Sequence, residues 1–247
     1  MANLFKKQLP TVVYFPSSLE TDHYIGGLYG YFVENTNSYN VITTEENNNY
    51  PMIHLIGEVM QDKPAESSGN LVGYYEDGKL IFIDTKGAIC KKEPFSMKLD
   101  IFSRNVGILE SDIMLKTGAM LVGCGSVGSL VAIELAKAGV GRFLLIDNDI
   151  LGYHNICRHQ CGILDVGRYK TEAVRDRILQ INPTAKVVIQ NKTVQEVPLS
   201  VFDEFCDKDT IVIGGEDNRE GDLYANSIAK EVGMPLMSIG CWERAAA

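Results

Sequence analysis

The stretch MLVGCGSVGSLVAIELAKAGVGRFLLIDNDILGYHNICR, Met120–Arg158, decides the fold. The apolar run over 119–122 predicts a buried strand, and a glycine-rich segment follows it at once. Helical periodicity over 130–138 predicts a helix, which Gly139 ends, and the apolar run over 143–146 predicts a second buried strand. The order strand, glycine loop, helix, strand is the setting that a nucleotide-binding fingerprint requires.

The glycine segment has the spacing GxGxxG, with Gly123, Gly125 and Gly128 at the fixed positions. In such a loop the glycines allow a tight turn, close approach of the backbone to a phosphate, and close packing of helix on strand. The N-terminus of the following helix offers free N–H groups to an anion. Asp147 comes 19 residues after Gly128, where an acid would hold a ribose hydroxyl. We therefore expect a nucleotide site.

The residues after Asp147 separate the classes of nucleotide-binding protein. A dehydrogenase would fit the fingerprint alone, but it has no need of a phosphate-gripping arginine and lysine downstream. Here Asn155, Arg158 and Lys170 follow, and Asp217 comes soon after the apolar run over 210–213. These residues favour a site that handles phosphates directly.

Together the motifs GxGxxG, D-x-D-x5-N-x2-R, Gly-x2-Lys and an Asp-Asn pair resemble the ThiF/MoeB/E1 superfamily. The resemblance covers roughly Asp100 to Ala247. It implies an adenylyltransferase that uses ATP and Mg²⁺ to activate the C-terminal carboxylate of a ubiquitin-like protein or a peptide. By the same resemblance, Arg158 and Lys170 grip the phosphates, Asp147 and Asn155 hold the nucleoside and first phosphate, and Asp217 holds Mg²⁺.

The segment before the glycine loop contains Phe102-Ser-Arg-Asn105. It is similar to the second half of a superfamily pattern, R-x-x-R-Q/N, whose arginine reaches the ATP of the neighbouring subunit. The first arginine of that pattern is absent here. The resemblance implies that Arg104 is catalytic and that the protein is a homodimer. The alternative is a solvated arginine at the start of a helix.

Composition narrows the class of protein. The 247 residues are 45% hydrophobic and 22% charged, as in ordinary globular proteins. The net charge of −9 and the lack of a Lys/Arg-rich run argue against nucleic-acid binding. No signal-peptide core opens the chain, and no apolar stretch approaches the ~20 residues of a membrane span. Six cysteines without CxxC pairs suit a reducing environment, so we expect a cytoplasmic protein without membrane partners.

The sequence pattern of residues 1–98 differs from that of the rest and predicts a small β-rich or α+β module. Apolar runs are short, at 11–15, 39–43 and 52–55, and residues 62–69 read as a loop. The pair Asp77-Gly78 lies between two β-rich runs, 71–75 and 80–83, which predicts a hairpin. No chemistry can be assigned to this module.

Residues 99–247 predict a Rossmann-like α/β domain with a mostly parallel sheet and helices on both faces. Ligands of such sheets lie beyond the carboxyl ends of the strands, where the glycine loop, Asp147 and Asp217 all follow strand ends. Beyond the fingerprint we expect helices over 169–181, 199–205 and 221–232, and strands over 186–190, 210–213 and 235–240. The chain stops where superfamily members continue, which favours a natural or engineered fragment.

Four cysteines and histidines, His154, Cys157, His159 and Cys161, crowd into eight residues. Their spacing lacks a CxxC knuckle and would place Arg158 inside the cage, so a packed, reduced pair is favoured over a metal site. The two CxxC pairs that hold zinc in many superfamily members are absent. Cys241 is a weak candidate for a thioester-forming cysteine.

The reading that these features favour is an E1-like activating enzyme, similar to bacterial proteins of ubiquitin-like conjugation operons, some of which serve defence against phage. One alternative is a peptide-adenylating enzyme of the microcin-maturing type, in which a β-rich N-terminal module clamps a peptide. Another is a non-catalytic nucleotide-binding scaffold that recruits a ubiquitin-like partner. A dehydrogenase comes last.

Overall fold

A computed structural model describes residues 9–46, 53–65, 69–97, 100–215 and 219–239, and the backbone of two short strands beyond them. The chain divides into two compact units, Met1–Asp100 and Ile101–Ala247. Each unit has its own core of buried side chains. The units are described separately below.

Seven strands of the first unit form one mixed sheet in the order β6-β5-β4-β2-β3-β1-β7. Their bounds are β1 Val12–Pro16, β2 Gly26–Val33, β3 Ser38–Thr43, β4 His54–Met60, β5 Leu71–Glu76, β6 Lys79–Ile83 and β7 Lys91–Phe95. The helical pieces described here are a four-residue helix, α1 Ser18–Thr21, and a 3-10 turn, η1 Glu34–Thr36. Of the two alternatives for this module, β-rich is therefore the correct one.

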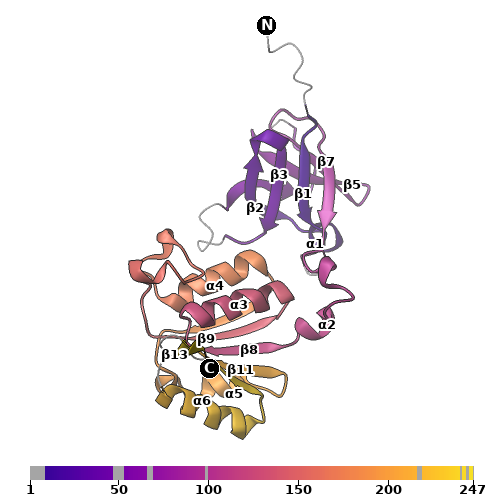
Figure 1. Cartoon of the computed structure of the whole chain (residues 1–247). Coiled ribbons are helices and arrows are strands. Elements are labelled where there is room, and N and C mark those ends of the chain that lie inside the picture. The colour runs from indigo at the N-terminus through magenta and orange to yellow at the C-terminus, as the bar shows by residue number, and fades with distance from the viewer. Residues whose placement is uncertain are drawn as a thin grey trace. The chain divides into compact units, whose positions relative to one another are not determined.

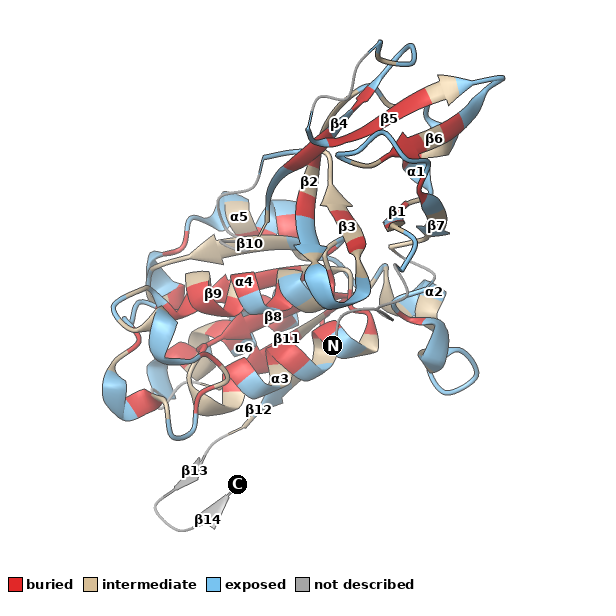
Figure 2. Ribbon diagram, turned by 90° about the horizontal axis from the view of Figure 1, so that it is seen from above, coloured by how far each residue is buried: buried red, intermediate tan, exposed pale blue. Residues whose placement is uncertain are grey.

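The sheet of the first unit curls back on itself. Ile83, the last residue of the edge strand β6, forms an antiparallel bridge with Ile89, two residues before the other edge strand, β7. Next to the bridge, the Cys90 N–H donates to the Phe82 carbonyl at 2.8 Å. Fully buried side chains of this unit include Val13 and Leu28. Figure 2 shows buried residues in red along β2 and β5. The closed shape gives about a hundred residues a core without a helical layer.

The predicted hairpin is present as β5 and β6. Asp77 and Gly78 both have positive φ, 50° and 74°, as a two-residue turn with the twist of the strands requires. The sequence patterns did not indicate β2 or β7. Strand β2 contains three glycines, which weaken a strand pattern, and β7 is a polar edge strand containing Pro94.

The second unit is a doubly covered parallel sheet. Five parallel strands lie in the order β10-β9-β8-β11-β12. Their bounds are β8 Gly118–Val122, β9 Arg142–Ile146, β10 Lys186–Gln190, β11 Thr210–Gly214 and β12 Leu236–Ser238. The helices are α2 Ser111–Met114, α3 Ser126–Ala138, α4 Lys170–Ile181, α5 Leu199–Phe205 and α6 Arg219–Val232. Short 3-10 turns are η2 Ser103–Asn105, η3 Tyr153–Asn155, η4 Ile163–Asp165 and η5 Val194–Glu196.

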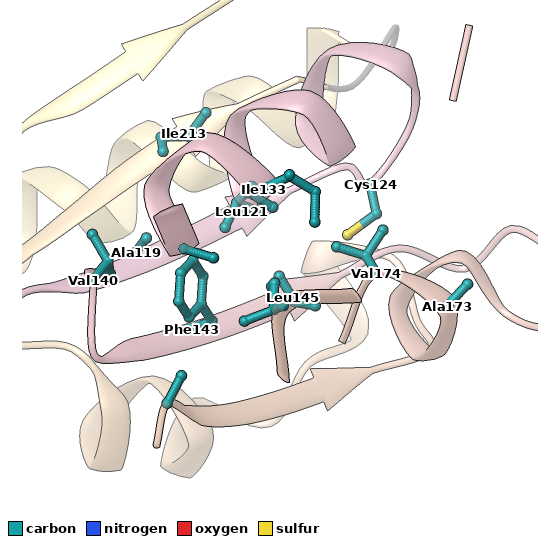
Figure 3. Close-up of a cluster of buried hydrophobic side chains, with 14 of the residues drawn as sticks. Ala119, Leu121, Cys124, Ile133, Val140, Phe143, Leu145, Ala173, Val174 and Ile213 are labelled. Atoms are coloured by element: carbon teal, nitrogen blue, oxygen red, sulfur yellow. The ribbon is translucent and has the colours of Figure 1, made fainter. Parts of the chain in front are cut away.

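Two apolar clusters cover the two faces of this sheet. On one face, residues of α3 and α4 such as Ile133 and Val174 pack on β8 and β9, as Figure 3 shows. On the other face, Phe202 of α5 and Ile228 of α6 pack on the same strands, and Figure 1 shows the two helical layers. The prediction of a Rossmann-like sheet with helices on both faces is confirmed.

Most predicted element bounds agree within one or two residues. The main difference is α3, which begins at Ser126, four residues before the apolar periodicity, because the helix starts inside the glycine motif. The predicted strand over 235–240 is only Leu236–Ser238, with Gly240 outside the described residues. Beyond it the backbone of β13 Cys241–Trp242 pairs antiparallel with β14 Ala245–Ala246. No helix in the described part of the chain is long and apolar enough to cross a bilayer.

Candidate functional site

The glycine loop joins β8 to α3 and leaves one side open. Gly123 has φ of +97°, a conformation that favours glycine, and its N–H donates to the Ile146 carbonyl at 2.8 Å. A Cβ on Gly128 would lie 1.9 Å from the Gly123 carbonyl oxygen, so this position has no room for a side chain. A Cβ on Gly125 would meet nothing within 4 Å. The space beside Gly125 is therefore where a ligand can approach the backbone.

Asp147, at the end of β9, braces this loop. Its side chain is buried, and Oδ2 accepts the Cys124 N–H at 2.7 Å while Oδ1 accepts the Asp149 N–H at 2.7 Å. Burial raises the pKa of Asp147, although the two N–H groups and the charge of Lys170 oppose the shift. A carboxylate has about four lone-pair sites, so about two remain for other hydrogen-bond donors.

Lys170, the first residue of α4, is only 8% exposed and is held from two directions. Its Nζ lies 2.6 Å from Oδ2 of Asp149, and its backbone N–H donates to the Asp149 carbonyl at 3.0 Å. The charge of Lys170 also lowers the pKa values of Asp147 and His159. Lys170 is therefore a buried cation with a fixed partner, Asp149, at the start of α4.

Asn155 and Arg158 lie on the crossing segment between β9 and α4. Oδ1 of the buried Asn155 accepts the Gly152 N–H at 2.8 Å, and its carbonyl accepts the N–H groups of Arg158 and His159. This compact turn presents the Arg158 side chain to solvent. Among the described residues, no hydrogen bond or ion pair to the Arg158 guanidinium is found, so it is available to an anionic ligand.

His159, directly after Arg158, connects the crossing segment to the glycine loop. The ring is buried, with Nε2 lying 2.8 Å from the Cys124 carbonyl oxygen and Nδ1 accepting the Cys161 N–H at 3.0 Å. Burial is the main cause of its lowered pKa. Across the described ranges, no group of three His, Cys, Asp or Glu side chains could hold a metal ion. Of the four clustered residues, His159 and Cys161 are buried, whereas His154 and Cys157 are exposed.

The third strand end at the site is that of β11. The Gly215 N–H donates to the Val122 carbonyl at 2.8 Å, which brings the chain after β11 against the glycine loop. Asp217 follows, but it lies outside the described residues. On α6, Oδ2 of Asp222 accepts the Ser238 hydroxyl at 3.0 Å, while its buried Oδ1 has no partner in the described part of the chain. Such hard oxygen atoms suit Mg²⁺.

Arg104 is the one candidate in the described residues that lies apart from this site. It is exposed on η2, and the neighbouring Asn105 donates to the Lys137 carbonyl at 3.0 Å. Lys137 lies in the last turn of α3, whereas the glycine loop is at the first turn. A helix of 13 residues is about 20 Å long, so Arg104 is anchored roughly that far from the loop of its own chain.

The sequence patterns gave no role at this site to two residues that the structure connects to it, Asp149 and His159. Asp149 was visible as the second acid of D-x-D, but nothing in the pattern pairs it with Lys170, 21 positions away. His159 was weighed only as a metal ligand, because its actual partners are backbone atoms that carry no sequence signal.

Comparison with known proteins finds a family for the second unit. The model of the ThiF family matches residues 101–245. The Mycobacterium tuberculosis protein named "Probable adenylyltransferase/sulfurtransferase MoeZ" is 26% identical over 63% of this chain and 39% of its own length. Ubiquitin-like modifier-activating enzyme 5 of Caenorhabditis elegans is 25% identical over 78% of this chain and 49% of its own length. The chain thus spans half or less of the length of both relatives.

Among solved structures, E. coli MccB, crystallised with MccA-N7isoASN, superposes with a TM-score of 0.52 and 23% identity. The match covers 60% of this chain and 46% of MccB. At that identity the likeness concerns the fold, and it agrees with the parallel sheet and glycine loop described above.

Proposed function

Because the chain belongs to the ThiF family, we propose that it activates the C-terminal carboxylate of a ubiquitin-like protein by adenylation with ATP. The observation that carries the proposal is the buried Lys170, whose ammonium pairs with Asp149. The Asp149 N–H donates to Asp147, the residue that braces the open glycine loop. A dehydrogenase would have no use for a cation fixed at this place. The relatives named for adenylyl transfer and for activation of a ubiquitin-like modifier support the substrate class.

The reaction joins two anions. A carboxylate oxygen attacks the α-phosphorus of ATP, the bond from that phosphorus to the bridging oxygen breaks, and pyrophosphate leaves with the electron pair. No general base is needed, because the nucleophile is already ionised. The protein's contribution is therefore positioning and the placement of positive charge.

Each residue then has a defined task. Asp147 accepts hydrogen bonds from the ribose, and the open Gly125 backbone faces a phosphate. Lys170 and Arg158 neutralise phosphate oxygens, and Asn155 shapes the turn that presents Arg158. When Mg²⁺ is bound, it supplies further charge neutralisation on the phosphates, with Asp217 as the proposed ligand.

We also propose that Arg104 acts on the site of a second copy of the chain. Its anchoring at the far end of α3 supports this, since roughly 20 Å separates it from its own glycine loop. The surrounding segment exposes large apolar side chains, with Val106 71%, Ile108 81% and Ile113 58% exposed. A two-fold dimer that buries this segment would bring each Arg104 toward the partner's site.

Two smaller proposals complete the assignment. Residues 1–98 and 99–247 form separate domains, the second carrying the chemistry. The cysteines in the described residues form no disulfide, which is compatible with a reducing cytoplasm.

The test of the function is exchange between ATP and labelled pyrophosphate. We expect exchange only when a ubiquitin-like protein that co-purifies with the chain is present, together with an acyl-adenylate detectable by mass. Exchange driven by a short peptide alone would favour the peptide-adenylating alternative. ATP binding without exchange would favour a scaffold, and tight NAD binding without ATP binding would refute the assignment.

A further inference from the structure

The protonation pattern of His159 follows from its two partners. The Cys161 N–H can only donate, so Nδ1, 3.0 Å away, must be the acceptor. The proton of the neutral ring is therefore on Nε2, which donates to the Cys124 carbonyl at 2.8 Å. A buried ring with both nitrogen atoms engaged by backbone groups has one orientation and one tautomer.

The carbonyl that His159 holds belongs to the peptide group linking Cys124 to Gly125. The chain has no cis peptide bond in the residues described, and a trans peptide directs its N–H opposite to its C=O. Holding the carbonyl toward the buried ring therefore turns the Gly125 N–H to the other side. Within the described residues the Gly125 N–H donates to no backbone carbonyl, and a Cβ on Gly125 would meet no atom within 4 Å, so a ligand has room beside this residue.

The other peptide group of Cys124 is held independently. Its N–H donates to Oδ2 of Asp147 at 2.7 Å. Close by, the Gln160 N–H lies 3.4 Å from the Ser129 hydroxyl, which ties the segment carrying His159 to the first turns of α3. The hydrogen bond from His159 therefore opposes rotation of the Cys124–Gly125 peptide, because it holds the carbonyl of that peptide directly.

We propose that His159 is a positioning residue that directs the Gly125 N–H at a phosphate of the nucleotide. This inference rests on the proposed ATP site and deepens it. Because His159 directly follows Arg158, the hydrogen bond from His159 to the Cys124 carbonyl also fixes the backbone position from which the arginine side chain extends. Without the histidine, the peptide can rotate and present a carbonyl oxygen to the phosphate, replacing an attraction by a repulsion.

Substitutions at His159 can separate its hydrogen bonds from its bulk. A glutamine has an N–H donor for the Cys124 carbonyl and an oxygen acceptor for the Cys161 N–H, so His159→Gln should retain the peptide direction. His159→Leu has neither and leaves both backbone groups unpaired. Val174→Ala is the matched control, because it removes buried volume from the same cluster without touching the peptide.

The experiment measures binding of ATP with MgCl₂ and of adenosine to the whole chain by calorimetry. We expect His159→Leu to bind ATP about 10- to 100-fold more weakly, the range of one hydrogen bond to a charged group. Adenosine, which lacks phosphate, should bind the variant within twofold of wild type. His159→Gln should restore ATP affinity, and Val174→Ala should lower the melting temperature without changing ATP affinity.

A spectroscopic readout reports on the amide itself. In ¹⁵N-labelled protein, the Gly125 signal should shift on addition of ATP in wild type and His159→Gln, but not in His159→Leu. Unchanged ATP affinity in folded His159→Leu, or equal losses for ATP and adenosine, would overturn the inference while leaving the proposed function intact. Wild type that binds no ATP would overturn both.

Discussion

The Nζ of Lys170 lies 2.6 Å from Oδ2 of Asp149, and the two partners differ sharply in exposure: 11% for the lysine side chain and 63% for the aspartate. A carboxylate that is mostly in solvent can swing away at little cost, whereas the ammonium stays in place. The pair therefore keeps the ammonium of Lys170 in place, and under the proposed function a phosphate replaces the Asp149 carboxylate as its partner.

The first prediction concerns Lys170 itself. Lys170→Ala should lower partner-dependent ATP–pyrophosphate exchange by about 100-fold or more, because a fixed cation is lost from a site of developing negative charge. The melting temperature should change little, since the remaining Asp149 is largely solvated. Lys230→Ala, an exposed lysine on α6, is the control and should exchange normally. Exchange by Lys170→Ala within threefold of wild type would remove the lysine from the mechanism.

The second prediction contrasts two glycines of the loop. Gly125→Ala meets no atom within 4 Å, so the variant should fold with a free energy of unfolding within about 1 kcal/mol of wild type, yet lose ATP affinity. Gly128→Ala would collide with the Gly123 carbonyl and should lower stability as well. Calorimetry and thermal melts separate the two effects. Normal ATP binding by Gly125→Ala would show that no ligand approaches the backbone there.

How much of this could be read from the sequence depends on what each residue contacts. The glycines and Asp147 follow the ends of strands, and Lys170 begins a helix. Their positions at one edge of the sheet could therefore be predicted from sequence spacing alone. His159 and Asp149 act through a carbonyl and through a residue 21 positions away, and neither relation leaves a periodic trace. In the first unit, β2 was hidden because its glycines break the apolar alternation.

The third prediction tests the shared site. Arg104→Ala and Lys170→Ala should each be inactive, since each removes a phosphate-directed cation from every site of its dimer. After subunit exchange of an equal mixture, half of the dimers carry one intact site, so activity should recover to roughly a quarter of wild type. Exchange of subunits is verified by mass-labelled chains. If labelled chains mix and activity stays absent, Arg104 does not act across the interface.

The fourth prediction is a pH dependence of stability with a defined sign. Burial lowers the pKa of His159 in the folded chain, so the unfolded chain takes up the proton more readily. Stability is therefore lost as the pH falls below about 6.5, the ordinary value for histidine, by at most about 1.4 kcal/mol for each pH unit. The charge of Lys170 also lowers the pKa of His159, while the charges of Asp147 and Asp165 raise it.

The measurement compares melting temperatures of wild type and His159→Gln between pH 7.5 and 5.5. Wild type should lose more stability over this interval, because glutamine does not titrate. The raised pKa of Asp147 has the opposite sign, but it contributes to both proteins and cancels in the difference. His154→Gln, an exposed histidine, is the control. Parallel curves for wild type and His159→Gln would contradict the prediction.

The fifth prediction concerns the metal. If Asp217 holds Mg²⁺, Asp217→Ala should lower exchange by about 100-fold or more while the melting temperature is kept. Excess EDTA should abolish exchange in wild type, and added MgCl₂ should restore it. Asp203→Ala on α5 is the control for the loss of one exposed carboxylate. Exchange in the Asp217 variant at the wild-type rate would require another ligand, for which the unpaired Oδ1 of Asp222 is the next to test.

The order of strands in the second unit also determines when each strand can find its partner during synthesis of the chain. Strand β8 carries the glycine loop and pairs with β9 on one side and β11 on the other, yet β11 ends at Gly214. At a synthesis rate of roughly 5–20 residues per second, one edge of β8 waits about 5 to 20 s for its partner strand. During that interval its open N–H and C=O groups can pair with a foreign strand. The foundation of the nucleotide site is thus the part of the nascent chain most exposed to mispairing.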